Sequence, residues 1–213
     1  MKERIGVLGS GVVAQTLAKG FLAKGYPVRI GSRSAEKLAD FSKASGIGSG
    51  TFADVSAYAE IVVLAVKGAV GVDALKIAGE ANLSGKIVVD TTNPIADAPP
   101  VNGVLQYFTT LEDSLLERLQ AAVPSARFVK AWNTIGNAFF VDPILPGGPP
   151  TQFLAGNDPE AKKVVARIVT EFGFAPEDFG TAVSARAIEP LCMLWCIPGL
   201  TGGGWAHGFR LLR

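Results

Sequence analysis

A glycine-rich segment near the N-terminus constrains the fold more than any other part of the sequence. Residues 9–14 (GSGVVA) match the pattern G-x-G-x-x-A. The strand-like stretch 4–8 (RIGVL) precedes them, and apolar residues at helical spacing, among them Leu17 and Phe21, follow. In this setting the first glycine makes a tight turn, the second lets the backbone approach a pyrophosphate, and the small third residue allows close helix–strand packing. The segment therefore predicts a dinucleotide site at a helix N-terminus, whose N–H groups and dipole attract anions.

Strand and helix patterns alternate along most of the chain, which predicts a parallel sheet covered by helices on both faces. We expect strands at 4–8, 26–31, 51–52, 60–66, 86–90 and 127–130, and helices at 12–24, 35–43, 71–81 and 111–122, with Asp54 capping a short helix and 46–50 forming a loop. The predicted fold is a doubly wound Rossmann domain over residues 1–145, with strand order 3-2-1-4-5-6.

A Pro/Gly-rich stretch at 142–150 (DPILPGGPP) marks the expected domain boundary. The remainder, 146–213, is predicted to be a small C-terminal α/β segment on the acceptor side that also mediates dimerisation. We expect strands at 152–155 and 174–179, a helix at 158–172 capped by Asp158, and two further helices at 183–197 and 205–212.

The composition narrows the class of partner. The formal net charge is +1, which argues against a nucleic-acid partner. With 48% hydrophobic and 18% charged residues the chain can bury a sizeable core. No uninterrupted apolar run reaches the roughly 18 residues of a spanning helix, so we expect no membrane span and a cytoplasmic location. The apolar C-terminal helices predict a buried interface, and hence a homodimer.

The end of the second predicted strand indicates which dinucleotide binds. NAD-binding proteins usually carry an acidic residue there for the ribose 2′-hydroxyl. Here the segment reads Gly31-Ser32-Arg33-Ser34, with no acid before Glu36. Arg33 can stack on adenine and pair with a 2′-phosphate, the two serines can donate hydrogen bonds to it, and Lys37 adds positive charge. The sequence therefore favours NADP over NAD.

The sequence contains no evident acid–base machinery. There is no Tyr-x-x-x-Lys pair, and we expect the single histidine, His207, to pack or cap rather than to catalyse. Asp73, Asp90 and Asp97 are expected to be caps or loop residues, and Cys192 and Cys196 buried thiols rather than zinc ligands. Several apolar and aromatic residues could form either a dry wall for a planar redox partner or ordinary core and interface: Trp132, Ile135, Met193, Trp195, Trp205 and Phe209.

Four segments together resemble the family of deazaflavin-dependent NADP oxidoreductases. They are IGVLGSGVVAQTLAKGFLAKGYPVRIGSR, VVDTTNP, VKAWNTIG and the C-terminal ARAIEPL followed by LW. The N-terminal part is also similar to the reductase domain of six-transmembrane ferric reductases. The resemblance covers nearly the whole chain and implies NADP as cofactor, deazaflavin coenzyme (factor 420) as co-substrate, and hydride transfer without an essential acid or base.

The site that we expect combines the motifs with what the resemblance implies. Its cofactor-binding residues are Gly9, Ser10, Gly11, Val12, Val13, Ser32, Arg33, Ser34, Lys37, Ala65, Val66, Lys67, Asn93, Pro94, Trp132, Asn133, Thr134 and Ile135. The resemblance implies that the residues from Ala65 onward border the nicotinamide and its redox partner. Two alternatives stay open: an NADPH-dependent reductase of free flavin, quinone or ferric chelates, and an NADP-binding sensor or electron-relay subunit.

Overall fold

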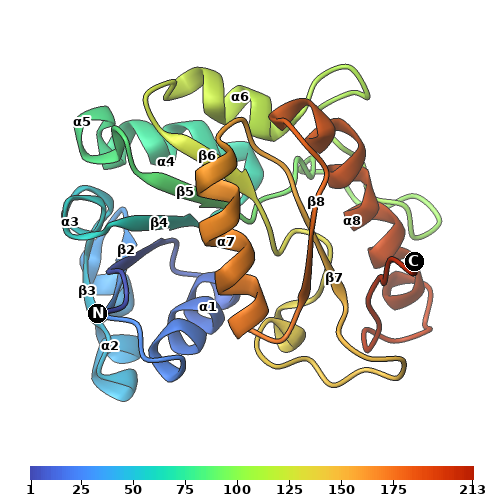
Figure 1. Cartoon of the computed structure of the whole chain (residues 1–213), viewed down its shortest axis with the longest axis horizontal. Helices are drawn as coiled ribbons and strands as arrows, with labels where there is room; N and C mark the ends of the chain where they lie inside the picture. Colours follow the sequence, from blue (N-terminus) through green and yellow to red (C-terminus); the bar gives the residue numbers. More distant parts are fainter.

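The computed structural model describes all residues 1–213 and has a six-stranded parallel sheet at its centre (Figure 1). The strands are β1 (Ile5–Leu8), β2 (Val28–Ser32), β3 (Gly48–Thr51), β4 (Ile61–Leu64), β5 (Ile87–Asp90) and β6 (Arg127–Lys130). Their spatial order, β3-β2-β1-β4-β5-β6, confirms the predicted Rossmann topology. Every residue of β1, β4 and β5 is buried, because helices cover both faces of the sheet.

Two hydrophobic cores lie on opposite faces of the sheet. The helices are α1 (Val12–Ala23), α2 (Ala39–Ser45), α3 (Phe52–Tyr58), α4 (Gly71–Ala78), α5 (Glu80–Leu83), α6 (Leu115–Ala122), α7 (Pro159–Glu171) and α8 (Ala185–Leu200). One core joins Phe21 of α1 and Phe172, which follows α7, to the sheet. The other joins Leu75 of α4 and Leu119 of α6 to it.

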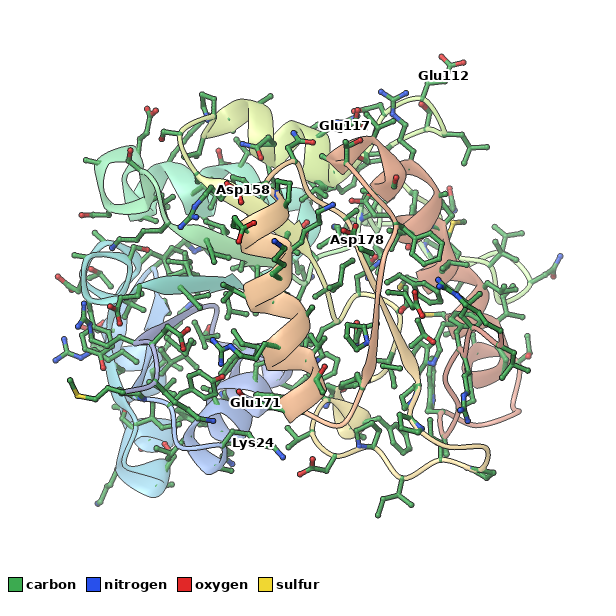
Figure 2. The ribbon with its side chains drawn as sticks, viewed as in Figure 1. Lys24, Glu112, Glu117, Asp158, Glu171 and Asp178 are labelled. Carbon is green, nitrogen blue, oxygen red and sulfur yellow. The ribbon has the colours of Figure 1, made fainter.

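The C-terminal part adds a second, two-stranded parallel sheet, β7 (Thr151–Leu154) with β8 (Ala175–Asp178). α7 connects the two strands and lies in front of the main sheet in Figure 1. Asp158 caps its N-terminus by accepting the N–H of Ala161, as predicted, and Glu171 lies at its other end (Figure 2). Val165 of α7 belongs to the same buried cluster as α1. The division of the chain at residue 145 stays a prediction.

Three local expectations were wrong. Gly48–Thr51 is a strand rather than a loop, because its backbone pairs with β2 although its residues have little β propensity. Thr51, not Asp54, is the N-cap of α3, and Asp54 completes a capping box from the third helical position. Residues 205–212 are not helical; this tail runs beside β7, with the N–H of Thr151 donating to the carbonyl of Phe209.

One helical stretch, Ala182–Leu200, is long and apolar enough by length and composition to cross a membrane. The core helix of a globular protein passes the same test. Glu189 in the middle of this stretch is buried against Lys130 of β6. The expected absence of a membrane span, the homodimer and the cytoplasmic location all stay predictions.

Candidate functional site

A cleft of about 450 Å³ opens where β1, β2 and β4 end. Parallel strands bring their carboxyl ends to one edge of a sheet, and ligands of open α/β sheets bind there, where the strand order reverses. In this chain the reversal lies between β1 and β4. The predicted residues that line the cleft are Gly9, Ser10, Gly11, Ser32, Arg33, Lys37, Ala65, Val66 and Lys67.

The glycine loop has the shape that anion binding requires. Gly9 has a φ of +146°, and a Cβ there would lie 2.2 Å from the carbonyl oxygen of Ala65. Gly11 is the N-cap of α1, and a Cβ there would meet nothing within 4 Å. No side chain caps α1, so the N–H groups of its first turn are left for a ligand or solvent. Val12, on that turn, is exposed.

The loop after β2 presents two cations that have no partner within the chain. Arg33 and Lys37 are exposed, line the cleft, and form no ion pair or side-chain hydrogen bond with protein groups. The Ser32 hydroxyl instead belongs to the turn: it donates to the carbonyl of Ser34 and accepts its N–H at 3.2 Å. The Ser34 hydroxyl donates to Glu36 and thereby lowers the pKa of that carboxyl. Ser34 does not line the cleft.

The wall opposite this loop contains residues that sequence reasoning missed. Val70, Ala74 and Ile77 line the cleft from the start and one face of α4, and Asp73 lies among them. Val70 and Ile77 are exposed, at 41% and 48%. The sequence predicted a helix at 71–81, but none of these residues was given a place in the site. Phe52 at the start of α3 completes the set.

Trp132 does not line the cleft, and its contact with the rings of the substrates stays a prediction. Its side chain is 1% exposed and packs edge-on against Phe21 and Phe172, while its indole N–H donates to the carbonyl of Phe140. Its backbone has a φ of +56°, and the Gln152 side chain accepts its N–H at 2.8 Å. The strained backbone turns the chain at the end of β6 and buries the indole.

The loops after β5 and β6 are fastened to each other rather than opened toward the cleft. Asn93 Nδ2 donates to the carbonyl of Asn133 at 2.8 Å, and Asn133 Nδ2 donates to Asn93 Oδ1 at 3.1 Å. Pro94, Thr134 and Ile135 are buried beside them. None of these residues, nor Val12 or Val13, is among those that line the cleft. Their contact with a cofactor stays a prediction.

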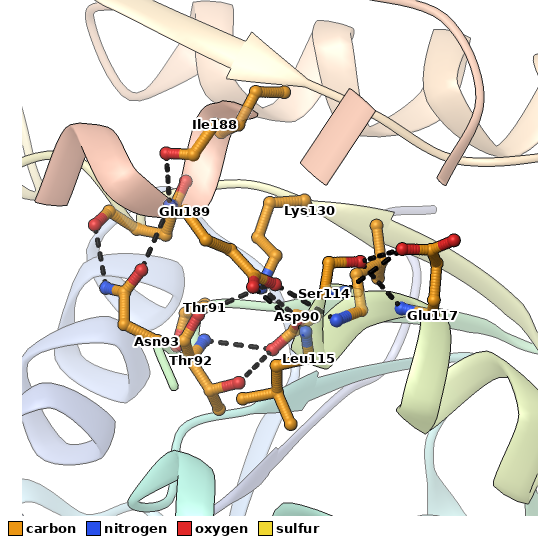
Figure 3. Close-up of polar contacts among 12 residues, drawn as sticks. Asp90, Thr91, Thr92, Asn93, Ser114, Leu115, Glu117, Lys130, Ile188 and Glu189 are labelled. Carbon is orange, nitrogen blue, oxygen red and sulfur yellow. Dashed lines mark hydrogen bonds and ion pairs between the residues drawn. The ribbon is translucent and has the colours of Figure 1, made fainter. Parts of the chain in front are cut away.

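A buried group of charges lies directly behind these loops (Figure 3). Lys130 Nζ is 2.5 Å from Asp90 and 2.8 Å from Glu189, and all three side chains are at most 2% exposed. Asp90 was expected to be a cap or loop residue; instead it closes β5 as part of this ion network. Sequence reasoning missed Lys130 and Glu189, because nothing local distinguishes a buried lysine at a strand end from an exposed one.

The predicted aromatic wall is only partly present. Trp195 and Trp205 flank a shallow cavity of about 360 Å³ beside the loop that contains Gly136. His207 stacks on Trp195, and its Nε2 lies 2.8 Å from the Trp195 carbonyl oxygen, so it is a packing residue as predicted. Ile135 belongs to the core.

The C-terminal helix α8 contributes the other residues singled out from the sequence. Met193 of that helix lies in a separate groove, next to Pro190. Cys192 is a buried free thiol, and Cys196 is a half-buried one.

The cleft fits a phosphorylated dinucleotide. It joins an uncapped helix N-terminus, a glycine with open space in front of it, and two unpartnered cations on the adjacent loop. The first two features suit a pyrophosphate and the cations suit a further phosphate on the ribose, while the apolar face of α4 suits an adenine ring.

Comparison with known proteins also indicates an NADP-dependent oxidoreductase. The family model described as NADP oxidoreductase, coenzyme F420-dependent, matches residues 4–94. A crystal structure named "putative f420 dependent nadp-reductase", from Arthrobacter sp. FB24, is 32% identical with a TM-score of 0.93, covering 100% of both chains. A hypothetical protein from Sinorhizobium meliloti is 28% identical with a TM-score of 0.73, over 87% of this chain and 88% of that one.

A curated relative extends the comparison to metal reduction. Metalloreductase STEAP3 from Rattus norvegicus is 30% identical over 206 residues, which cover 94% of this chain and 39% of that protein. The chain thus spans about two fifths of the length of this relative. Both resemblances expected from the sequence are confirmed. The full-length match to the Arthrobacter protein, together with the family model, shows that this chain belongs to the family of coenzyme F420-dependent NADP oxidoreductases.

Proposed function

We propose that this NADP oxidoreductase transfers a hydride between NADP(H) and a deazaflavin coenzyme. The observation that carries the proposal is the cleft at the ends of β1, β2 and β4, with its open helix N-terminus and its unpartnered Arg33 and Lys37. The family description and the name of the Arthrobacter relative support deazaflavin as the second substrate.

The chain's own residues would bind and orient the dinucleotide. The N–H groups that open α1 would hold the pyrophosphate, with Gly11 leaving it room, and Arg33 and Lys37 would hold the 2′-phosphate. The segment Ala65–Lys67 would border the nicotinamide half. When bound, NADPH supplies the hydride from carbon 4 of its nicotinamide ring.

The transfer itself requires no side-chain acid or base, because a hydride would pass directly between two rings held face to face in a dry site. The proton that completes the reduced deazaflavin would come from solvent. The geometry of His207 supports this reading. Both its ring and its Nε2 are engaged with Trp195, so it is occupied by packing. His207→Gln should therefore lower the Tm while the rate of hydride transfer stays close to that of the wild-type protein.

The test is to mix the protein anaerobically with NADPH and oxidised deazaflavin coenzyme and to follow the visible absorbance of the deazaflavin. We expect rapid bleaching, much slower with NADH. The matched control is Arg33→Ala, which should bleach slowly with either nucleotide. No bleaching by wild-type protein that demonstrably binds NADPH would refute deazaflavin as the substrate.

Ferric chelates are the second candidate substrate, favoured by the similarity to a metalloreductase. Reduction of a ferric chelate by NADPH and free flavin, with no bleaching of deazaflavin, would select it. Tight NADPH binding without turnover of any of these acceptors would instead support an NADP-binding subunit that relays electrons to a partner.

A further inference from the structure

The buried charges of Lys130, Asp90 and Glu189 lie between the predicted nicotinamide side of the cleft and helix α8. We propose that Lys130 and Glu189 are positioning residues, which fix the loop after β5 and helix α8 relative to the bound nicotinamide. The inference rests on the proposed use of the cleft for NADP(H), and its test is chosen so that the two can fail separately.

The Lys130 ammonium contacts groups on three different parts of the chain. Nζ lies 2.5 Å from Asp90 Oδ2 at the end of β5, 2.8 Å from Glu189 Oε1 on α8, and 2.9 Å from the carbonyl oxygen of Thr92. One ammonium therefore joins a strand end, the following loop and the C-terminal helix (Figure 3). A flexible surface lysine could not define their relative positions in this way.

The two carboxylates also accept hydrogen bonds from neighbouring backbone and side-chain groups. Asp90 Oδ1 accepts the N–H of Thr92 at 2.9 Å and its hydroxyl at 2.6 Å. Glu189 accepts the N–H groups of Leu115 and Leu116, at 2.9 and 3.0 Å, which open helix α6. Glu189 thus ties α8 to α6 as well as to Lys130.

Burying this network costs free energy, because its charges do not cancel. Two carboxylates and one ammonium leave a net negative charge in the interior, offset by the positive end of the α6 dipole. Although burial by itself lowers the pKa of Lys130, the neighbouring carboxylates of Asp90 and Glu189 outweigh it and hold the pKa above its usual value. Well-packed apolar residues often stabilise a fold as well as a buried ion network does, so we look for a role of this network beyond stability.

The loop after β5 packs directly against the segment that lines the cleft after β4. The N–H and the hydroxyl of Thr91 both donate to the carbonyl of Leu64, at 3.2 and 2.9 Å, directly before the cleft-lining Ala65. A Cβ on Gly68 would lie 2.1 Å from the carbonyl oxygen of Asn93. Residues 91–93 therefore pack directly against the segment 65–68, and we expect a displacement of one to displace the other.

The same loop is also fastened to α8. Asn133, which is bonded to Asn93, donates its other amide proton to the carbonyl of Ile188 at 3.3 Å. The Tyr107 hydroxyl donates to the carbonyl of Glu189 at 2.9 Å. Loosening the Lys130 network should hence shift the nicotinamide side of the cleft while the loop of Arg33 and Lys37, on the far side of β1, stays in place.

The experiment compares two ligands on Lys130→Met and Glu189→Gln. NADPH occupies both halves of the cleft, whereas adenosine 2′,5′-bisphosphate lacks the nicotinamide half. We expect the Kd of NADPH to rise about 10-fold in each variant, and that of the bisphosphate to stay within about 2-fold of wild type. The rate of hydride transfer to deazaflavin should fall by about 100-fold, the usual consequence of a misplacement of about 1 Å.

Lys162→Met is the matched control. Lys162 on α7 is 8% exposed and donates to Asp178 and to the carbonyl of Gly180, at 2.8 and 2.9 Å, and none of these residues belongs to the β5 loop or to the Lys130 network. The Lys162→Met protein should have a lower Tm but the same ratio of the Kd of NADPH to that of the bisphosphate as the wild-type protein.

An unchanged ratio of Kd values in Lys130→Met and Glu189→Gln, with only a lower Tm, would overturn the inference. Glu189→Gln keeps the shape of the side chain and supplies the measurement if Lys130→Met does not fold. If wild-type protein transfers no hydride to deazaflavin, the proposed acceptor is wrong, yet the ratio still decides the role of Lys130.

Discussion

Gly9 and Gly11 form a matched pair, because the structure gives each glycine of the motif a different reason to lack a side chain. In Gly9→Ala the new Cβ would lie 2.2 Å from the backbone oxygen of Ala65, at a φ of +146°. In Gly11→Ala the Cβ would meet nothing within 4 Å, and the φ of −79° suits any residue. The first change should therefore damage the fold, and the second only the binding of a ligand.

The magnitudes follow from these contacts. Gly9→Ala incurs about 1–3 kcal/mol of backbone strain and about 1–3 kcal/mol of overpacking. At about 2–4 °C per kcal/mol for a chain of this size, its Tm should fall by about 10 °C. Gly11→Ala should stay within about 2 °C of wild type. Its methyl group occupies the space proposed for the pyrophosphate, so the Kd values of NADPH and NADH should both rise about 10-fold or more.

Thermal unfolding and titration of nucleotide fluorescence check both variants, with Gly48→Ala as the control. Gly48 lies in the edge strand β3, away from the glycine loop, and a Cβ there would make an ordinary 3.7 Å contact with Arg29 of β2. If Gly11→Ala bound both nucleotides as wild type does, the pyrophosphate could not lie against this loop. A Gly9→Ala protein with wild-type Tm would contradict the close contact with Ala65.

Three further predictions follow from single side chains. Arg33→Ala should raise the Kd of NADPH about 10- to 100-fold but that of NADH no more than about 3-fold, since a charge-assisted bond to the 2′-phosphate is lost; equal losses in titrations would contradict this. Hydrogen bonding from Arg186 holds the pKa of Glu117 below its usual value although partial burial opposes it. Glu117 thus contributes stability above the unfolded pKa of about 4.3, which is lost as the pH falls through the folded value. Glu117→Gln should reduce the difference in unfolding free energy between pH 7 and acidic pH, measured in urea. An unchanged difference would show that Glu117 does not contribute to this pH dependence. Trp132→Phe should cost about 1–3 kcal/mol, because the donor to Phe140 and core volume are lost, while the Kd of NADPH stays within about 2-fold; a larger loss of binding would return Trp132 to the site.

Features that depend on neighbours in the sequence could be predicted. The GSGVVA motif, the uninterrupted apolar strand Ile61–Leu64 and the cap Asp158 all follow from turn chemistry, patterning or capping within a few residues. The loop bearing Arg33 could be placed because parallel strands end at one edge of the sheet.

Features that depend on distant packing could not. The strand Gly48–Thr51 forms because β2 offers its edge, and the exposed face of α4 became a cleft wall because β1 and β4 end beside it. Trp132 is buried because Phe21 of α1 and Phe172, which follows α7, pack against its indole.

The sequence by itself determined the Rossmann topology, the glycine-rich turn before α1 and the positive charge beside it. The turn and the charge depend on neighbouring residues, and the topology follows from the alternation of strand and helix patterns along the chain. Only the tertiary structure decided that Lys130, Asp90 and Glu189 share one buried network, since their side chains come from β6, β5 and α8. The environment of a charge depends on what covers it, and that is settled only when segments far apart in the sequence pack together.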